Sequence, residues 1–252
     1  MIRHTLSTLF VILAVVGGST ARAVETDITI RVISRDAKFV GSSVGGAHVT
    51  VSEAQTGVVL AQGVTEGGTG DTDLIMKNPR ERNTMLATED AAKFSTVIDL
   101  ERPTRLDVRV IGPMSQPHAA NTVTASQWVL PGRGTDEEGW ILELPGLIVD
   151  IEETGLSVGA DGKVAVRATV RMMCGCPLKP GGLWDSDAFE ISALLRRDGE
   201  IVERISMQFA GEESKFEGTI PVASAGRYDV EVWAYQPSTG NAGFDVAPIA
   251  VR

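Results

Sequence analysis

The chain has 252 residues, with 23 lysines and arginines against 33 aspartates and glutamates, and a formal net charge of −10. Such an acidic surface repels phosphate backbones and anionic lipids, which argues against a nucleic-acid partner. Two cysteines cannot stabilise a chain of this length by cross-linking, so apolar cores must supply most of its stability.

The first residues predict a cleaved secretory signal. A short polar start contains Arg3, the apolar core Leu6–Val16 is too short to cross a bilayer, and Ala21-Arg22-Ala23 has the small-x-small cleavage pattern. We therefore predict a signal peptide over 1–23 and a mature chain from Val24, located in the periplasm or secreted, without a membrane span. Removing Arg3 and Arg22 and no acidic residue changes the net charge from −10 to −12.

The first half of the mature chain predicts a β-sandwich. Runs rich in Val, Ile and Thr alternate apolar and polar residues and are separated by turn residues. Pro145-Gly146 is the predicted domain boundary, because Pro cannot continue a β-ladder and Gly relaxes the backbone. This gives a first domain over 24–145 and a second over 146–252. The predicted strands of the first are Asp27–Ser34, Ala47–Glu53, Val58–Gln62, Ala91–Asp99, Thr104–Ile111, Val123–Leu130 and Trp140–Leu144.

A turn pattern in this half resembles a known family. Gly45-Gly46-Ala47-His48-Val49-Thr50-Val51, followed by the turn and strand of Thr56–Thr65, is similar to the transthyretin-like or carboxypeptidase-regulatory-like domains. The sequence departs from the family pattern at Glu66–Gly70, where an Asp and one Gly are usual. Because such domains are mostly accessory folds, the resemblance implies binding or structure more than catalysis.

The second half predicts another β-sandwich. Its segment Gly226-Arg227-Tyr228-Asp229-Val230 resembles the penultimate strand of immunoglobulin-like sandwiches, where a Tyr clamps the preceding corner. We therefore expect an Ig-like or fibronectin-like module, and an all-β protein of two β-sandwich domains in tandem. The predicted strands are Leu147–Ile151, Lys163–Arg171, Asp187–Arg196, Glu200–Phe209, Phe216–Val222, Ala225–Tyr235 and Ala242–Val251.

Both cysteines lie in one turn, Met172-Met173-Cys174-Gly175-Cys176. In an oxidising compartment Cys174 and Cys176 favour a disulfide. Alternatively, the two thiolates and two thioethers form a soft ligand set that selects copper(I), or the thiols serve redox exchange. Extending the strand alternation places Cys174 toward the core and Met173 toward solvent.

Two neighbouring features bear on that turn. Trp184 follows Cys176 by eight residues and would flank a copper(I) site, shielding it from water. Asp185-Ser186-Asp187 lacks the EF-hand spacing of a calcium loop, which favours a solvated turn over an ion site; the alternative is a role in shaping the sulfur-containing loop.

The candidate chemistry favours binding over catalysis. The mature chain keeps only two histidines, His48 and His118. Its Gly-x-Ser-x-Gly match, Gly41-Ser42-Ser43-Val44-Gly45, lies in a predicted loop and not in the strand-to-helix turn of a nucleophile elbow. We expect a non-enzymatic, exported binding or assembly module without a certain cofactor, whose partner is another exported protein. The alternative is a periplasmic copper(I)-handling protein whose ligands are Met172, Met173, Cys174 and Cys176.

Overall fold

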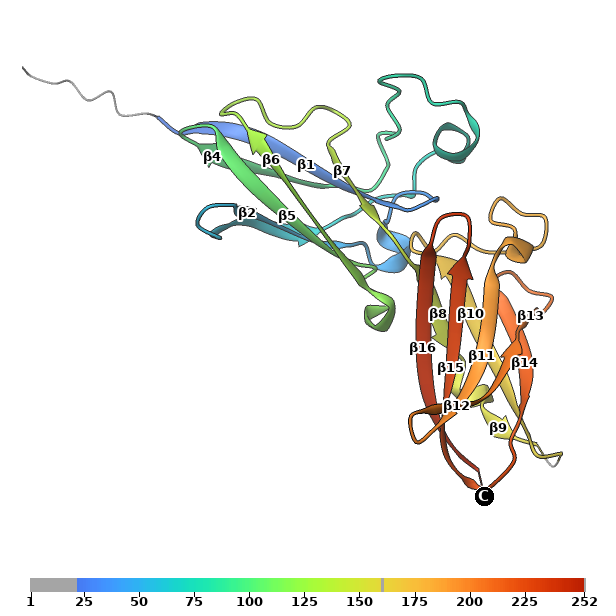
Figure 1. Cartoon of the computed structure of the whole chain (residues 1–252). Coiled ribbons are helices and arrows are strands. Elements are labelled where there is room, and N and C mark those ends of the chain that lie inside the picture. The colour runs from blue at the N-terminus through green and yellow to red at the C-terminus, as the bar shows by residue number, and fades with distance from the viewer. Residues whose placement is uncertain (1–21, 160, 252) are drawn as a thin grey trace, which may run out of the picture.

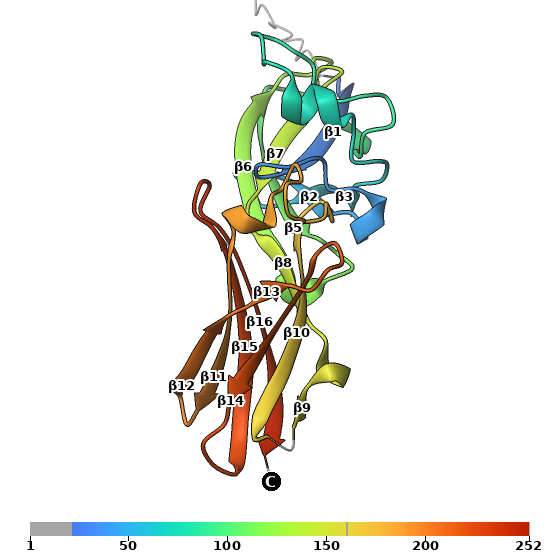
Figure 2. The same cartoon turned by 90° about the vertical axis from the view of Figure 1, so that its right-hand side faces the viewer.

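The structure, a computed structural model, describes residues 22–159 and 161–251, so the predicted signal peptide lies almost entirely outside the described residues. Two β-sandwiches lie end to end and meet at a bend, which Figure 1 shows in profile, while Figure 2 shows one sandwich above the other. The predicted all-β fold class is confirmed. Sheets built before Pro145-Gly146 share no strand with those built after it. We call the two units the N-terminal sandwich (β1–β7) and the C-terminal sandwich (β8–β16).

The N-terminal sandwich packs a three-stranded sheet, in the order β4-β1-β7, on a four-stranded sheet, β3-β2-β5-β6. Strand β1 runs antiparallel to β4 and parallel to β7. The resemblance to transthyretin-like domains stays a prediction. The strands are β1 (Val24–Ser34), β2 (His48–Glu53), β3 (Val59–Val64), β4 (Phe94–Leu100), β5 (Thr104–Gly112), β6 (Asn121–Val129) and β7 (Trp140–Leu144), with 3₁₀ turns η1 (Ser42–Val44) and η3 (Pro117–Ala119) and a π-helical turn η2 (Asp73–Lys77).

The alternation of apolar residues explains why this sandwich forms. Leu106, Val108 and Val110 on β5 are fully buried between the sheets, and the charged residues between them face outward. Strand β4 begins at Phe94, later than predicted, because the preceding residues form isolated bridges to the loop around Glu66.

The C-terminal sandwich pairs the order β13-β14-β10-β8, with short β9 beside β10, against β12-β11-β15-β16. Two facing antiparallel sheets of these strands form an Ig-like or fibronectin-like module, as predicted. The elements are β8 (Leu147–Ile151), η4 (Glu153–Gly155), β9 (Ser157–Val158), β10 (Lys163–Met172), η5 (Ser186–Ala188), β11 (Glu190–Arg197), β12 (Glu200–Ser206), β13 (Gln208–Phe209), β14 (Lys215–Pro221), β15 (Gly226–Gln236) and β16 (Asn241–Val251).

The predicted tyrosine clamp is confirmed at the start of β15. The Tyr228 hydroxyl donates a hydrogen bond of 2.8 Å to the carbonyl of Ser224, four residues upstream. The guanidinium of Arg197 lies 5.4 Å from the centre of the Tyr228 ring, which fixes the corner from the other side.

The prediction of a single strand over Glu200–Phe209 is wrong. The run Glu200–Phe209 is not one strand, because the chain changes sheets at Met207. Before it, β12 pairs with β11; after it, β13 pairs with β14 in the opposite sheet. This crossover opens the edge of the sandwich beside β11.

Candidate functional site

The sulfur-containing turn closes directly after β10. The Met172 amide donates to the Cys176 carbonyl at 3.1 Å, and the Gly175 amide donates to the Met172 carbonyl at 2.8 Å. Gly175 has φ of 80°, a backbone conformation that glycine adopts without steric cost. Cys174 and Cys176 are joined by a disulfide. The turn therefore holds its two sulfurs covalently together.

The sulfur atoms of the turn are divided between two cores. Met172, Cys174 and Cys176 belong to the core of the C-terminal sandwich, and each residue is 6 % exposed or less. Met173 is fully buried in the core of the N-terminal sandwich, with Val44 among its members. The prediction that Met173 faces solvent is wrong, because the neighbouring domain covers that face. Copper(I) binding by these four residues stays a prediction.

Gly175 also marks where the sandwiches touch. A Cβ atom at Gly175 would lie 2.7 Å from a methyl group of Val44 on η1, closer than atoms in contact can approach. Glycine is therefore favoured at this position for two reasons: its backbone has a positive φ, and Val44 leaves no space for a Cβ atom. The sulfur-containing turn is part of the joint between the sandwiches.

Trp184, for which flanking a copper site stays a prediction, bridges the joint. Its indole Nε1 donates to the carbonyl of Asp36 at 2.8 Å, and its ring is mostly buried in the C-terminal core. The Asp36 carboxylate accepts a hydrogen bond of 2.6 Å from the Gln236 amide at the end of β15. One loop of the N-terminal sandwich is thus held by two elements of the C-terminal one.

Asn241 is a second polar anchor of the joint, and it is fully buried. Its Nδ2 donates to the Arg35 carbonyl at 3.1 Å and to the Gln236 side chain at 3.0 Å, while its Oδ1 accepts from the Gly146 amide at 2.9 Å. Buried polar groups with all these partners orient the domains specifically, since each lost bond would leave an unsatisfied group.

The histidine of η3 lies on the same joint. His118 Nε2 is 3.0 Å from the carbonyl oxygen of Val149 and 3.9 Å from a carboxylate oxygen of Asp150. Asp245 completes this group, and the three side chains offer atoms within 4.8 Å of one another. Its carboxylate already accepts from the Ile151 amide at 2.7 Å. This cluster is a polar seam between η3, β8 and β16.

Asp185 shapes the loop that follows the sulfur-containing turn. One carboxylate oxygen accepts from the amides of Gly181 at 3.0 Å and Asp187 at 3.2 Å. The predicted loop-shaping role therefore falls on Asp185, which positions Trp184 against the N-terminal sandwich.

The C-terminal sandwich carries an aromatic face on β15 and β16. Trp233 and Tyr235 point outward from β15, in the opposite phase to the buried Val230 and Val232, and Phe244 lies beside Trp233 on β16. Tyr235 and Phe244 are 42 % and 48 % exposed. The three aromatic rings, with the small residues Ala234, Ala242 and Gly243 between them, line an open hollow of about 570 Å³. The sequence predicts which side chains of β15 face the core and which face outward, but it does not predict how β15 pairs with β16.

Charged groups border this aromatic face without neutralising its apolar character. Arg196 donates to both carboxylate oxygens of Glu231, at 2.7 and 3.2 Å, and hydrogen bonding to Glu231 raises the pKa of Arg196 above its ordinary value. Trp233 Nε1 donates to Glu231 at 3.1 Å, and the Arg204 guanidinium lies 5.6 Å from the Trp233 ring centre. These contacts hold the aromatic rings in place.

No family model and no curated protein matches the sequence. Among solved structures, the chain is similar to the chicken interferon gamma receptor alpha chain, with 11 % identity over 92 % of this chain and 99 % of that one and a TM-score of 0.33. It is also similar to the fibronectin(III)-like modules of CbhA from Clostridium thermocellum, with 12 % identity over 90 % and 94 % of the two chains and a TM-score of 0.30.

A third similar structure is the tip fimbrial protein Mfa3 from Porphyromonas gingivalis, with 8 % identity over 91 % of this chain and 82 % of that one and a TM-score of 0.25. The fold assignment rests on the strand topology of the chain itself. Within residues 22–159 and 161–251, no helix is long and apolar enough to cross a membrane.

Proposed function

We propose that the chain is an exported, non-catalytic binding module that recognises another exported protein through its C-terminal sandwich. The observation that carries this proposal is the aromatic face of Trp233, Tyr235 and Phe244. Exposed aromatic clusters bordered by polar groups are typical of protein interfaces, because rings bury much apolar area at little cost in conformational entropy.

The joint supports the same function. Two sandwiches held by a buried methionine, a disulfide-linked turn and several polar anchors act as one extended body. A rigid body loses less entropy when it binds than two loosely linked domains would. The N-terminal sandwich therefore serves as a spacer that presents the aromatic face at a fixed orientation.

A partner-capture experiment tests the proposal. The chain would be immobilised and incubated with the exported protein fraction of its own source, and retained proteins identified by mass spectrometry. The test variant is Tyr235→Ser/Phe244→Ser, and the control is Val97→Ser, which removes a side chain that is 56 % exposed on the N-terminal sandwich.

The proposal expects one partner that the wild type and the Val97→Ser control retain and that the aromatic-face variant loses. Retention of the same partner by all three proteins, or of none by the wild type, would contradict it. Circular dichroism spectra of the variants would verify that both remain folded.

A further inference from the structure

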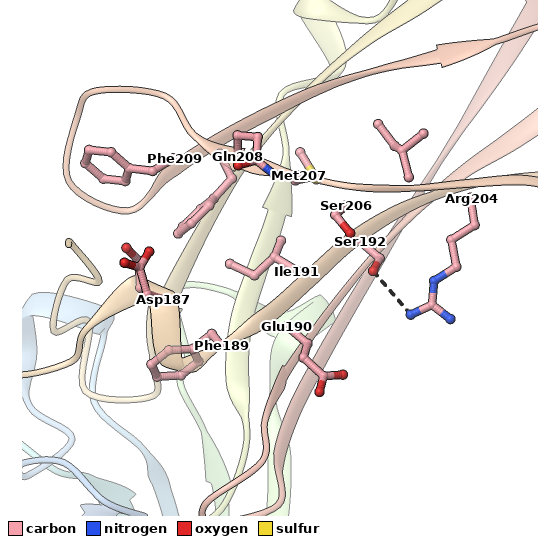
Figure 3. A pocket seen from close by; sticks show the side chains of 13 residues that line it. Asp187, Phe189, Glu190, Ile191, Ser192, Arg204, Ser206, Met207, Gln208 and Phe209 are labelled. Atoms are coloured by element: carbon pink, nitrogen blue, oxygen red, sulfur yellow. Dashed lines mark hydrogen bonds between the residues drawn. The ribbon is translucent and has the colours of Figure 1, made fainter.

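A groove opens beside β11 at the place where the chain changes sheets (Figure 3). It has a volume of about 640 Å³. The mostly buried side chains of Ile191, Met207 and Phe216 form its floor, and the partly exposed rings of Phe189 and Phe209 border it. The groove thus exposes a strip of the C-terminal core that a continuous β12 would have covered.

The edge of β11 along this groove has unpaired backbone groups. The Ile191 carbonyl accepts from the Met207 amide at 2.9 Å, and beyond that bond the two strands diverge. The Ile191 amide lies on the same side of β11 as the Ile191 carbonyl and therefore faces the groove, whereas the Phe189 amide donates to the Ser186 carbonyl at 3.2 Å. Within the described part of the chain, no backbone hydrogen bond outside the regular strand ladders reaches the Ile191 amide or the Phe189 carbonyl.

The opposite border of the groove is a second open edge. The Ala210 amide donates to the Lys215 carbonyl on β14, so Phe209, one residue earlier, directs its amide and carbonyl away from β14. The Met207 carbonyl points in the same direction as its bonded amide, toward β11. Free backbone groups at a strand edge are templates for an added strand, and here they are the Ile191 amide and the Phe189 carbonyl on one border and the Phe209 amide and carbonyl on the other.

Charge is distributed unevenly along the groove. Asp187 lies at one end and Arg204 at the other, where Arg204 donates to the Ser192 hydroxyl at 3.2 Å (Figure 3). Glu190, which is exposed, lies between these two ends and adds a second negative charge to the lining (Figure 3). An occupant with a basic residue near Asp187 and an apolar residue between Phe189 and Phe209 would complement both the charge and the apolar floor.

We propose that this groove binds an extended segment of the partner protein, which adds a β-strand to the open edge of β11. The segment has alternating apolar residues, one of which enters the groove, and a lysine or arginine next to Asp187. This inference rests on the proposed binding function and specifies its chemistry. The aromatic face adjoins the groove through Ser192 and Arg204, so both can contact one partner.

The first experiment uses a defined peptide, acetyl-Lys-Thr-Val-Thr-Leu-Thr-Val-amide, and the same peptide with its three central amides N-methylated. Binding to the full chain is followed by amide hydrogen exchange and by titration. We expect the unmodified peptide to slow exchange at Ile191 and Phe209, and the methylated peptide to bind at least ~10-fold more weakly, because it cannot donate to a strand edge. Equal binding of the two peptides, or no protection of either amide, would overturn the inference.

A charge exchange tests the orientation. The variant Asp187→Lys should weaken binding of the lysine peptide by about 5-fold and strengthen binding of a peptide with Glu in place of Lys by a similar factor. The control Asp198→Lys alters a carboxylate that is 92 % exposed at the hairpin tip and should change neither affinity. An Asp187→Lys variant with unchanged preference would refute the predicted direction of the strand.

The two proposals fail in different ways. A captured partner that depends on Tyr235 and Phe244 but is not displaced by the peptide would keep the binding function and reject the groove as its site. Peptide binding with the predicted protection, together with no partner from the exported fraction, would keep the groove and reject the proposed function.

Discussion

Met172 and Met173 are neighbours in the chain, and their side chains lie in the hydrophobic cores of two different sandwiches. This follows from the alternation of a strand whose end is covered on both faces. The last residue of β10, Met172, thus packs into its own domain, and the first residue after the strand, Met173, packs into the domain before it. The disulfide-linked turn that follows continues this contact through Gly175.

The first prediction concerns Met173. Replacing it by Ala should lower the free energy of unfolding by about 2–5 kcal/mol, the usual range for a large-to-small change in a core. Urea denaturation followed by tryptophan fluorescence would measure it. The control Met114→Ala, at a side chain that is 41 % exposed, should change stability by less than about 0.5 kcal/mol. Equal effects of the two changes would mean that the joint does not bury Met173.

Gly175 and Gly181 allow a matched comparison across the joint. Both have positive φ, 80° and 64°, but only Gly175 has a neighbour, Val44, in the space of a Cβ. Gly181→Ala should cost about 1–2 kcal/mol from its backbone conformation alone. Gly175→Ala should cost a further 1–3 kcal/mol or so from overpacking, part of which a second change, Val44→Ala, restores. Thermal unfolding of the four proteins measures this, and a missing rescue would count against direct contact.

The tyrosine clamp predicts different effects for two tyrosines on β15. Tyr228→Phe removes the hydroxyl that donates to the Ser224 carbonyl and should destabilise the protein by about 0.5–1.5 kcal/mol. Tyr235→Phe changes an exposed ring and should have no measurable effect on stability. Chemical denaturation of both variants compares them directly; a larger effect at Tyr235 would contradict the assigned orientation of β15.

Copper(I) binding can be tested on the oxidised protein. Cys174 and Cys176 are bonded to each other, and the two thioethers lie in separate cores. We therefore expect that the oxidised protein does not take copper(I) from a copper(I) chelator. After reduction, any affinity should equal that of a Met172→Leu/Met173→Leu variant treated alike. A strong site in the wild type that Cys174→Ser/Cys176→Ser abolishes, and that also needs both methionines, would establish the copper alternative.

The sequence predicted features whose causes are local. The alternation of buried and exposed residues along β5 and the Tyr228 clamp depend on neighbours within a few residues, and the structure confirms both. Met173 was assigned to solvent because strand alternation says nothing about a second domain. The crossover at Met207 was missed for a similar reason, since Glu200–Phe209 has strand composition throughout and only the sheets decide where it divides.

The candidate binding surfaces could be predicted only in part. The outward phase of Trp233 and Tyr235 follows from the alternation of β15, but their proximity to Phe244 depends on the register with β16. The groove depends on where two paired strands separate, which is beyond the hydrogen bond from the Met207 amide to the Ile191 carbonyl. Such long-range relationships are not encoded in any one segment of the chain.

The central claim is that the sulfur-containing turn is a rigid structural joint between two sandwiches. Residual dipolar couplings of backbone amides, measured in one alignment medium for β1–β7 and β8–β16, test it most directly. The account predicts that a single alignment tensor fits both sandwiches in the arrangement seen in Figures 1 and 2. Two tensors of different magnitude would show that the sandwiches reorient independently and would contradict the claim.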